Sequence, residues 1–282
     1  MTTQDPEAPE GVDLERPNAA RIYDWFLGGD ANWAIDRQFG EQAVKTFPMI
    51  KTVARVGRDF LGRGVQYLAR NGIDQFLDLG SGVPTVGNVH EVAAEVNPNA
   101  RCVYVDNEPV AVAHSQVLLE KEGVADRHAV LQGDLRDPAD IWKRALETGV
   151  LDTNRPIGLI IVGVLYFLGE DEPVAEIIQK YLSLLPSGSY FLSSHLTTEG
   201  LDALADQDSR ASIVEQYNKS STPLYLRSKA EFTSFFEGLE LVEPGIVYLP
   251  EWHPEEIESR ATRKLANDPA FSGHICGLGR KP

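Results

Sequence analysis

The sequence has few cysteines, no long apolar run and no secretory start. Its two cysteines, Cys102 and Cys276, lie far apart and without the paired spacing of metal sites. We therefore expect core thiols in a reducing cytoplasm, with neither a disulfide nor a bound metal. The chain has no tract of about 18 apolar residues, and its N-terminus lacks a basic start followed by an apolar region. The expectation is a soluble cytoplasmic protein without a membrane segment.

Basic residues are also scarce, because 26 bases face 42 acids and leave a formal net charge of −16. Binding to DNA or RNA depends on basic patches that release counterions, so nucleic acid is not an expected partner. Part of the acidic excess lies in residues 1–15, which contain acids, prolines and small residues but no Lys or Arg. This composition predicts a disordered acidic tail.

Residues 16–72 are predicted to be helical. A short helix begins near Pro17 and ends at Gly28 and Gly29, and two further helices are expected over residues 33–47 and 49–71. Most aromatic residues in this region fit a packed helical cap. Tyr23 and the polar and flexible groups around residues 18–32 are also of the kind that closes over a ligand. We interpret residues 16–72 as a lid with the first helices, and residues 73–282 as the core domain.

Residues 76–87 contain the most informative motif in the chain. An apolar run ends in an acid and the sequence Gly80-Ser81-Gly82, which predicts a buried parallel strand that breaks into a tight turn before a helix. Glycines without Cβ atoms permit positive φ angles and the close approach of a ligand, and a helix N-terminus presents unpaired N–H groups. The motif predicts a nucleotide-binding corner, although a strand-to-helix turn without a ligand is a simpler alternative.

The residues around the corner distinguish between possible nucleotides. A dinucleotide fingerprint requires a third glycine where Thr85 stands, and Pro84 has no N–H to donate to a pyrophosphate. A nicotinamide-dependent oxidoreductase is therefore disfavoured. Asp78, two residues before the first glycine, suits a ligand that carries a cation or hydroxyls, such as S-adenosylmethionine.

Two further predicted strands end in acids. The strand over residues 101–106 ends in Asp106, close to the offset of about 20 residues at which an acid reaches ribose hydroxyls. Asn107 either contacts adenine or caps the next helix. After the strand at 129–132, Asp134 either accepts from an adenine amino group, with the Leu135 N–H donating to a ring nitrogen, or caps the following helix.

The remaining pattern predicts an α/β protein. Residues 157–168 form the most apolar run and are expected to include the central strand, and a helix at 173–185 and a strand at 189–195 follow. Alternating strands and helices indicate a parallel sheet with helices on both faces. Two more strands are expected, at 239–249 and 274–280.

Together these motifs resemble class I S-adenosylmethionine-dependent methyltransferases. More narrowly, the chain resembles the actinobacterial S-adenosyl methyltransferase family, formerly a domain of unknown function, across nearly all of residues 15–282. The segments that carry this narrower resemblance are residues 16–24, 27–29, 78–87, 164–168 and 277–282.

The resemblance implies a Rossmann-like fold whose seven-stranded sheet has six parallel strands and an antiparallel last strand, with an N-terminal helical lid. It also implies that S-adenosylmethionine binds, and that Tyr23, Gly28 and Gly29 belong to the lid. The implied cofactor contacts are Gly80 and Gly82 with the methionine part, Asp106 with the ribose, Asp134 and Leu135 with the adenine, and Val164 with the sulfonium.

The implied activity is in-line methyl transfer to a small-molecule acceptor. A sulfonium is already an activated donor, so the protein need only orient a nucleophile and supply a base where that nucleophile is an alcohol. His195, at a strand end, and Tyr166, after the central strand, are the candidate catalytic residues, and His253 is a weaker candidate. A strand-end histidine is also commonly a structural hydrogen-bonding residue. Because no base is evident from the motifs, a non-catalytic S-adenosylmethionine sensor is the alternative.

Overall fold

The fold is built around one sheet of eight strands, seen in a computed structural model that describes residues 11–85, 87–199, 212, 214–256 and 259–282. The strand order is β3-β2-β1-β4-β5-β8-β6, and β7 pairs separately with β8. The strands are β1 Gln75–Leu79, β2 Arg101–Asp106, β3 His128–Gln132, β4 Gly158–Ile161, β5 Tyr190–Leu196, β6 Glu240–Leu241, β7 Val247–Tyr248 and β8 His274–Arg280.

The first five strands form the parallel part of the sheet. Parallel pairing joins β1 to β2 and β4, β2 to β3, and β4 to β5, whereas β8 runs antiparallel to β5. All of β1 is buried, and successive side chains enter different cores: Phe76 packs on one side of the sheet, Leu77 and Leu79 on the other. This alternation is expected for a strand that is covered on both faces.

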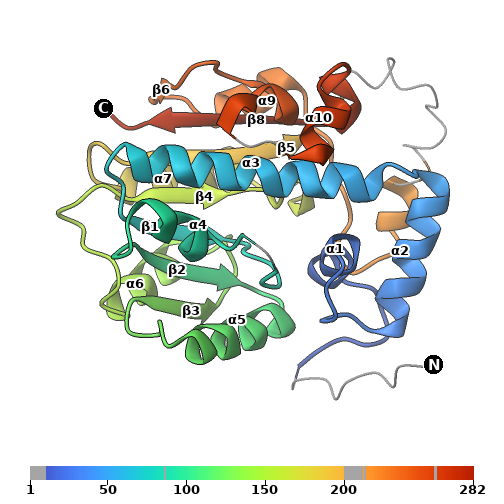
Figure 1. The fold of residues 1–282 in the computed structure, drawn as a ribbon, viewed down its shortest axis with the longest axis horizontal. Coiled ribbons are helices and arrows are strands. Elements are labelled where there is room, and N and C mark those ends of the chain that lie inside the picture. Colours follow the sequence, from blue (N-terminus) through green and yellow to red (C-terminus); the bar gives the residue numbers. More distant parts are fainter. Residues whose placement is uncertain (1–10, 86, 200–211, 213, 257–258) are drawn as a thin grey trace.

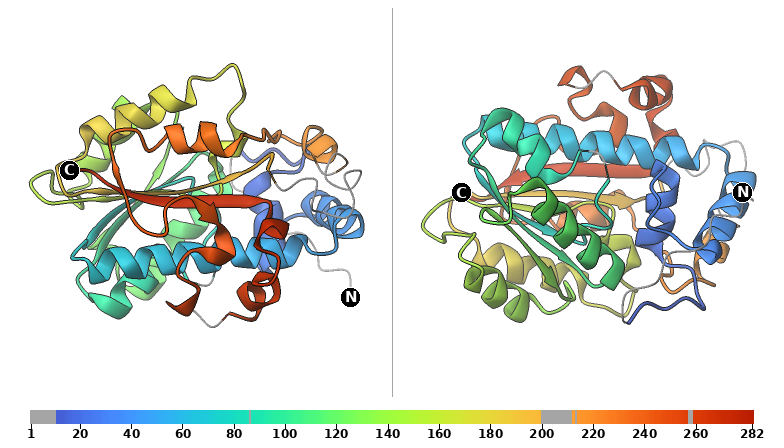
Figure 2. Two further views of the ribbon diagram at one scale, coloured as in Figure 1. Left: turned by 90° about the horizontal axis from the view of Figure 1, so that it is seen from above. Right: turned by 60° about the horizontal axis from the view of Figure 1, so that its bottom comes forward.

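Helices cover both faces of this sheet (Figures 1 and 2). One core contains side chains of α3, α4, α5 and α10, and the other contains side chains of α6, α7 and α9. The prediction of a mostly parallel, Rossmann-like sheet is therefore confirmed. The helices are α1 Ala19–Leu27, α2 Ala34–Thr46, α3 Ile50–Arg70, α4 Val89–Val96, α5 Pro109–Glu122, α6 Pro138–Glu147, α7 Val174–Leu184, α9 Lys229–Ser234 and α10 Arg260–Leu265.

The predicted number of seven strands is wrong, because the segment at 239–249 forms two short strands. Both strands pair antiparallel with β8. Leu241 pairs with Gly279 and Val247 pairs with Cys276, so the chain advances six residues on one side and only three on the β8 side. Between them Gly245 donates a backbone hydrogen bond to Val242 at 2.8 Å. Pro244 has no N–H for the ladder, so the extra residues leave the sheet as a turn and the strand is divided.

Helices α1 and α2 lie beside the edge toward which the arrowheads of β2 and β3 point (Figure 1). Side chains of Ile22 and Phe26 in α1 pack with Tyr217 and Leu224 from the second half of the chain. Most of the predicted acidic tail, residues 1–10, lies outside the described residues. None of the described helices is long and apolar enough to cross a membrane.

A buried arginine anchors α1 at this edge. The fully buried guanidinium of Arg21 donates to Asp36 at the start of α2, at 2.9 Å, and to Glu108 before α5, at 3.2 Å. It also donates to the backbone carbonyls of Asp13 and Arg16, both at 2.9 Å. Because the cation and its carboxylates are removed from water together, each needs the other to remain buried.

The Arg21→Leu substitution should lower the free energy of unfolding by about 3 to 5 kcal/mol, because it leaves two buried carboxylates without their cation. Urea denaturation measures this loss. Arg55→Leu, which removes an exposed arginine of α3, is the matched control and should change stability by no more than about 0.5 kcal/mol. Equal losses in the two variants would contradict the anchoring role.

Candidate functional site

A cavity of about 660 Å³ lies at the carboxyl-terminal edge of the parallel strands. Its volume falls within the range of small-molecule sites, about 300 to 1,000 Å³. The structure brings most of the predicted site residues to its wall, although they come from distant parts of the sequence. These residues are Tyr23, Asp78, Gly80, Ser81, Gly82, Asp106, Asn107, Asp134, Leu135, Val164 and Tyr166.

The glycine corner after β1 has the geometry that its sequence predicts. Gly80 and Gly82 have φ angles of 70° and 67°, in the left-handed region that favours glycine. A Cβ on Gly80 would lie 2.5 Å from a methyl group of Val164, so the corner is in close contact with the segment that follows β4. The backbone N–H of Gly80 donates to the carbonyl of Val105 at 2.7 Å, which fixes the corner to the end of β2.

Asp106 links the corner to the next helix. One carboxylate oxygen accepts from the Gly82 N–H at 2.8 Å, and the other accepts from the Glu108 N–H at 2.8 Å. Burial raises the pKa of Asp106, and these backbone donors oppose that effect. Each carboxylate oxygen can accept a second hydrogen bond, so Asp106 can hold the corner and a ligand hydroxyl together.

Asp78 is a buried acid beside the corner. Burial raises its pKa to about 7, with the nearby Arg58 lowering it and Asp106 raising it. An ionised carboxylate at this depth is costly unless a cation neutralises it. Burial therefore favours the protonated form of Asp78, and a neighbouring cation would favour its ionised form.

Asp134 is held by a neighbour that the sequence did not reveal. Arg136 donates to it through Nη2 at 2.5 Å and Nε at 2.9 Å, and reaches Glu172 through Nη1 at 2.7 Å. These hydrogen bonds lower the pKa of Asp134. The alternative that Asp134 caps the next helix is wrong, because Asp137 accepts from the Asp140 N–H at the start of α6.

Gly28 and Gly29 do not line the cavity. Gly28, with φ 92°, ends α1, and a Cβ on Gly29 would collide with the carboxylate of Asp24. Asn32 donates to Asp24 at 2.8 Å and to the Gly29 carbonyl at 3.0 Å. The glycines therefore let the chain turn tightly against Asp24, and the prediction that they contact the ligand is not supported.

His195 does not line the cavity either, although it lies at a strand end as predicted. Its side chain is fully buried; Nδ1 donates to the Leu196 carbonyl at 2.6 Å and Nε2 accepts from Arg227 at 3.0 Å. Burial lowers its pKa to about 4. His195 is a neutral structural histidine, so the geometry does not support its predicted role as the base.

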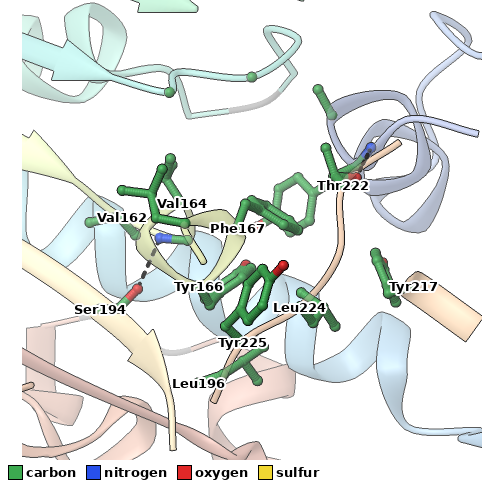
Figure 3. A pocket seen from close by; sticks show the side chains of 18 of the residues that line it. Val162, Val164, Tyr166, Phe167, Ser194, Leu196, Tyr217, Thr222, Leu224 and Tyr225 are labelled. Atoms are coloured by element: carbon green, nitrogen blue, oxygen red, sulfur yellow. Dashed lines mark hydrogen bonds between the residues drawn. The ribbon is translucent and has the colours of Figure 1, made fainter. Parts of the chain in front are cut away.

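The cavity has two chemically different parts. We call the part at the Gly80–Gly82 corner and the ends of β2 and β3 the polar half. The opposite part, the aromatic half, contains the short helix η1 Leu165–Phe167 and a segment of residues 217–226 (Figure 3). Side chains that line the aromatic half are Tyr166, Phe167, Leu196, Tyr217, Leu224 and Tyr225.

His274 is a cavity residue that the sequence interpretation missed. It begins β8 and pairs with Leu196, near the end of β5. Because β8 is antiparallel, its first residue lies at the edge where the parallel strands end. Strand direction could therefore have identified His274 from the sequence. An antiparallel last strand places its first residue at the edge of the sheet where the parallel strands end and the cavity lies.

Comparison with known proteins identifies close relatives. The family model described as S-adenosyl methyltransferase matches residues 5–282. A DUF574 family protein from Streptomyces avermitilis is 37% identical with a TM-score of 0.85, over 96% of this chain and 99% of that one. A candidate methyltransferase from Thermobifida fusca is 37% identical with a TM-score of 0.84, over 97% and 98%. No curated protein matches the sequence.

A more distant structure shares the fold alone. An O-methyltransferase family protein from Burkholderia thailandensis is 12% identical with a TM-score of 0.52, over 86% of this chain and 70% of that one.

Asp78→Asn should remove the part of the pH dependence of stability that Asp78 causes. The folded pKa of Asp78, about 7, lies above its ordinary value of 3.8. Between these pH values the folded state keeps a proton that the unfolded state has lost, so wild-type stability falls as pH rises through this window. From about pH 5 to pH 7 the variant should gain up to about 3 kcal/mol relative to wild type, two pH units at about 1.4 kcal/mol each. Urea denaturation of both proteins across this range tests it, and parallel stability curves would contradict a buried acid at this position.

Proposed function

The chain belongs to the S-adenosyl methyltransferase family, and we propose that it methylates a small molecule bound in the same cavity as the methyl donor. As a member of this family it is a methyltransferase that uses S-adenosylmethionine. The observation that supports a small-molecule acceptor is the continuity of the cavity, which extends from the Gly80–Gly82 corner to Tyr217 and Tyr225. The net charge of −16 disfavours a nucleic-acid acceptor.

The polar half has the features that the donor requires. In this proposal Asp78 faces the positively charged methionine part, and the open corner of Gly80 and Gly82 leaves room for it. Asp106 accepts from the ribose hydroxyls with the lone pairs that its two backbone partners leave. Adenine lies beside Asp134 and Leu135, with the sulfonium near Val164.

When bound, S-adenosylmethionine supplies an activated methyl group on a sulfonium. The work of the protein is to hold the acceptor in line with that group and to exclude water. Tyr166, one of the predicted catalytic residues, lines the aromatic half, and burial raises the pKa of its phenol. It therefore remains protonated near neutral pH and can orient the acceptor through its ring and hydroxyl, but it cannot serve as a base there.

Asp106→Ala should weaken the binding of S-adenosylhomocysteine by about 1 to 3 kcal/mol through the loss of charge-assisted hydrogen bonds. Calorimetric titration measures this change, with Glu147→Ala, an exposed acid of α6, as the control. Asp106→Ala also removes the hydrogen bonds that fix the corner, and this loss alone would weaken binding. The titrations are therefore repeated with the 2′-deoxy analogue of S-adenosylhomocysteine, which lacks one ribose hydroxyl. Wild type should prefer the ribose form and the variant should not, and a preference that survives in the folded variant would contradict ribose binding by Asp106.

Incubation with methyl-labelled S-adenosylmethionine and a cell extract tests the acceptor class. The extract is divided into small-molecule and macromolecular fractions, and label should appear in the small-molecule fraction. An Asp106→Ala sample run in parallel should show less label, which excludes transfer by contaminants. Label found only in the macromolecular fraction would contradict a small-molecule acceptor.

A further inference from the structure

The carboxylate of Asp134, which follows β3, is largely occupied by one neighbour. Its Oδ1 accepts a hydrogen bond from the backbone N–H of Arg136 at 2.9 Å. The guanidinium of the same residue places Nε 2.9 and 3.0 Å from the two carboxylate oxygens, and its Nη2 donates to Oδ2 at 2.5 Å. Because a carboxylate accepts at about four positions, these three N–H groups leave little capacity for a ligand.

Arg136 is a stronger partner for this carboxylate than a neutral amino group would be. Its hydrogen bonds lower the pKa of Asp134, so the folded structure stabilises the ionised form. Hydrogen bonds between ionised groups are roughly twice as strong as those between neutral groups. Glu172 holds the same guanidinium from another side, through Nη1 at 2.7 Å. We therefore expect an adenine amino group in the cavity to leave the pair of Asp134 and Arg136 intact.

Two further carboxylates that line the cavity come from the loop before α7, and neither replaces Asp134 as an acceptor. Glu172 accepts from Arg136 through Oε1 and from the Gly169 N–H through Oε2, at 2.6 Å. Asp171 is exposed, so an amino group there would only take the place of water, with a small net gain. The described carboxylates of this loop thus provide no strong acceptor for the amino group of adenine.

Leu135 offers a different contact to a base. Its side chain packs in the core, which leaves its backbone to face the cavity that it lines. The Leu135 carbonyl accepts from the Tyr181 hydroxyl at 3.0 Å, and the Asp134 carbonyl accepts from the Asp137 N–H at 3.0 Å, so the turn is fixed. No described residue accepts a hydrogen bond from the Leu135 N–H. A fixed N–H without a protein partner suits an acceptor on a ligand, and N1 of adenine is such an acceptor.

We infer that the site recognises the base of the methyl donor through its ring nitrogen N1 and not through its amino group, and that Arg136 determines this specificity. The inference rests on the proposed function, which places adenine beside Asp134 and Leu135. The Leu135 N–H donates to N1, and Arg136 keeps the Asp134 carboxylate occupied, so the amino group contributes little to binding. A base whose N1 carries a hydrogen, such as hypoxanthine, would set two donors against each other and is rejected.

Three forms of S-adenosylhomocysteine test this specificity by calorimetric titration of the wild-type protein. The purine form has a hydrogen in place of the amino group and keeps N1 as an acceptor, whereas the hypoxanthine form carries a hydrogen on N1. The purine form should bind within about fivefold of the adenine form, and the hypoxanthine form should bind more than about fivefold more weakly. Either ratio on the other side of this limit overturns the inference. The purine form is smaller than the adenine form, so a steric clash cannot account for a loss.

These titrations contain no methyl acceptor, so their failure remains distinct from failure of the proposed function. The proposed function fails when label appears in macromolecules alone, whichever form of the donor product binds.

Arg136→Leu tests the role of Arg136. It frees the Asp134 carboxylate to accept from the amino group, so the variant should bind the adenine form more than about fivefold more tightly than the purine form. Adding Asp134→Ala to this variant should abolish the new preference. Arg55→Leu, which removes an exposed arginine outside the cavity lining, should keep the wild-type ratio. A ratio that stays at the wild-type value in Arg136→Leu overturns the role of Arg136, and the wild-type titrations test the inference even if this variant does not fold.

Discussion

The hydrogen bonds between the Gly80–Gly82 corner and the end of β2 hold the site together. Gly80 is bound to the Val105 carbonyl and Gly82 to the Asp106 carboxylate, so the loop after β1 takes its shape from the neighbouring strand. The same corner contacts Val164 at the end of β4. The ends of β1 and β2 and the segment that follows β4 are thus placed relative to one another by a few contacts, and the cavity lies along them.

The distribution of charge around that point defines how the enzyme can act. Most acids and arginines of the described lining lie in the polar half, and Glu172, which is bound to Arg136, lies between this half and Tyr225 of the aromatic half. A methyl donor that is already activated requires little chemical assistance, so catalysis depends mainly on orientation and exclusion of water. The described lining of the aromatic half includes the buried phenols of Tyr166 and Tyr217, whose pKa values are raised by burial, so they remain neutral near neutral pH.

Local motifs and long-range contacts differed in how well they could be predicted. The corner and the acids at strand ends were recognisable because adjacent residues determine the turn and because parallel strands end at one edge. His195 and His274 could not be separated in this way. Both lie near that edge, but His195 points into a fully buried network with Arg227, and His274 reaches the cavity because β8 runs in the opposite direction. Which of the two side chains reaches the cavity depends on Arg227 and on the direction of β8, and both are distant in sequence from β5.

The sequence by itself determined the alternation of strands and helices, the glycine corner, and the acids that follow β1, β2 and β3, since these depend on hydrophobic periodicity and local backbone freedom. Only the tertiary structure decided that Gly28 and Gly29 turn against Asp24, that Arg136 holds Asp134, and that rings from both halves of the chain form one neutral wall. The first two features are short-range contacts whose geometry depends on how the side chains are buried, and Arg136 also reaches Glu172, 36 residues away. The third depends on contacts between distant segments, such as the hydrogen bond between Ala19 and Thr222, 203 residues apart, which no local pattern encodes.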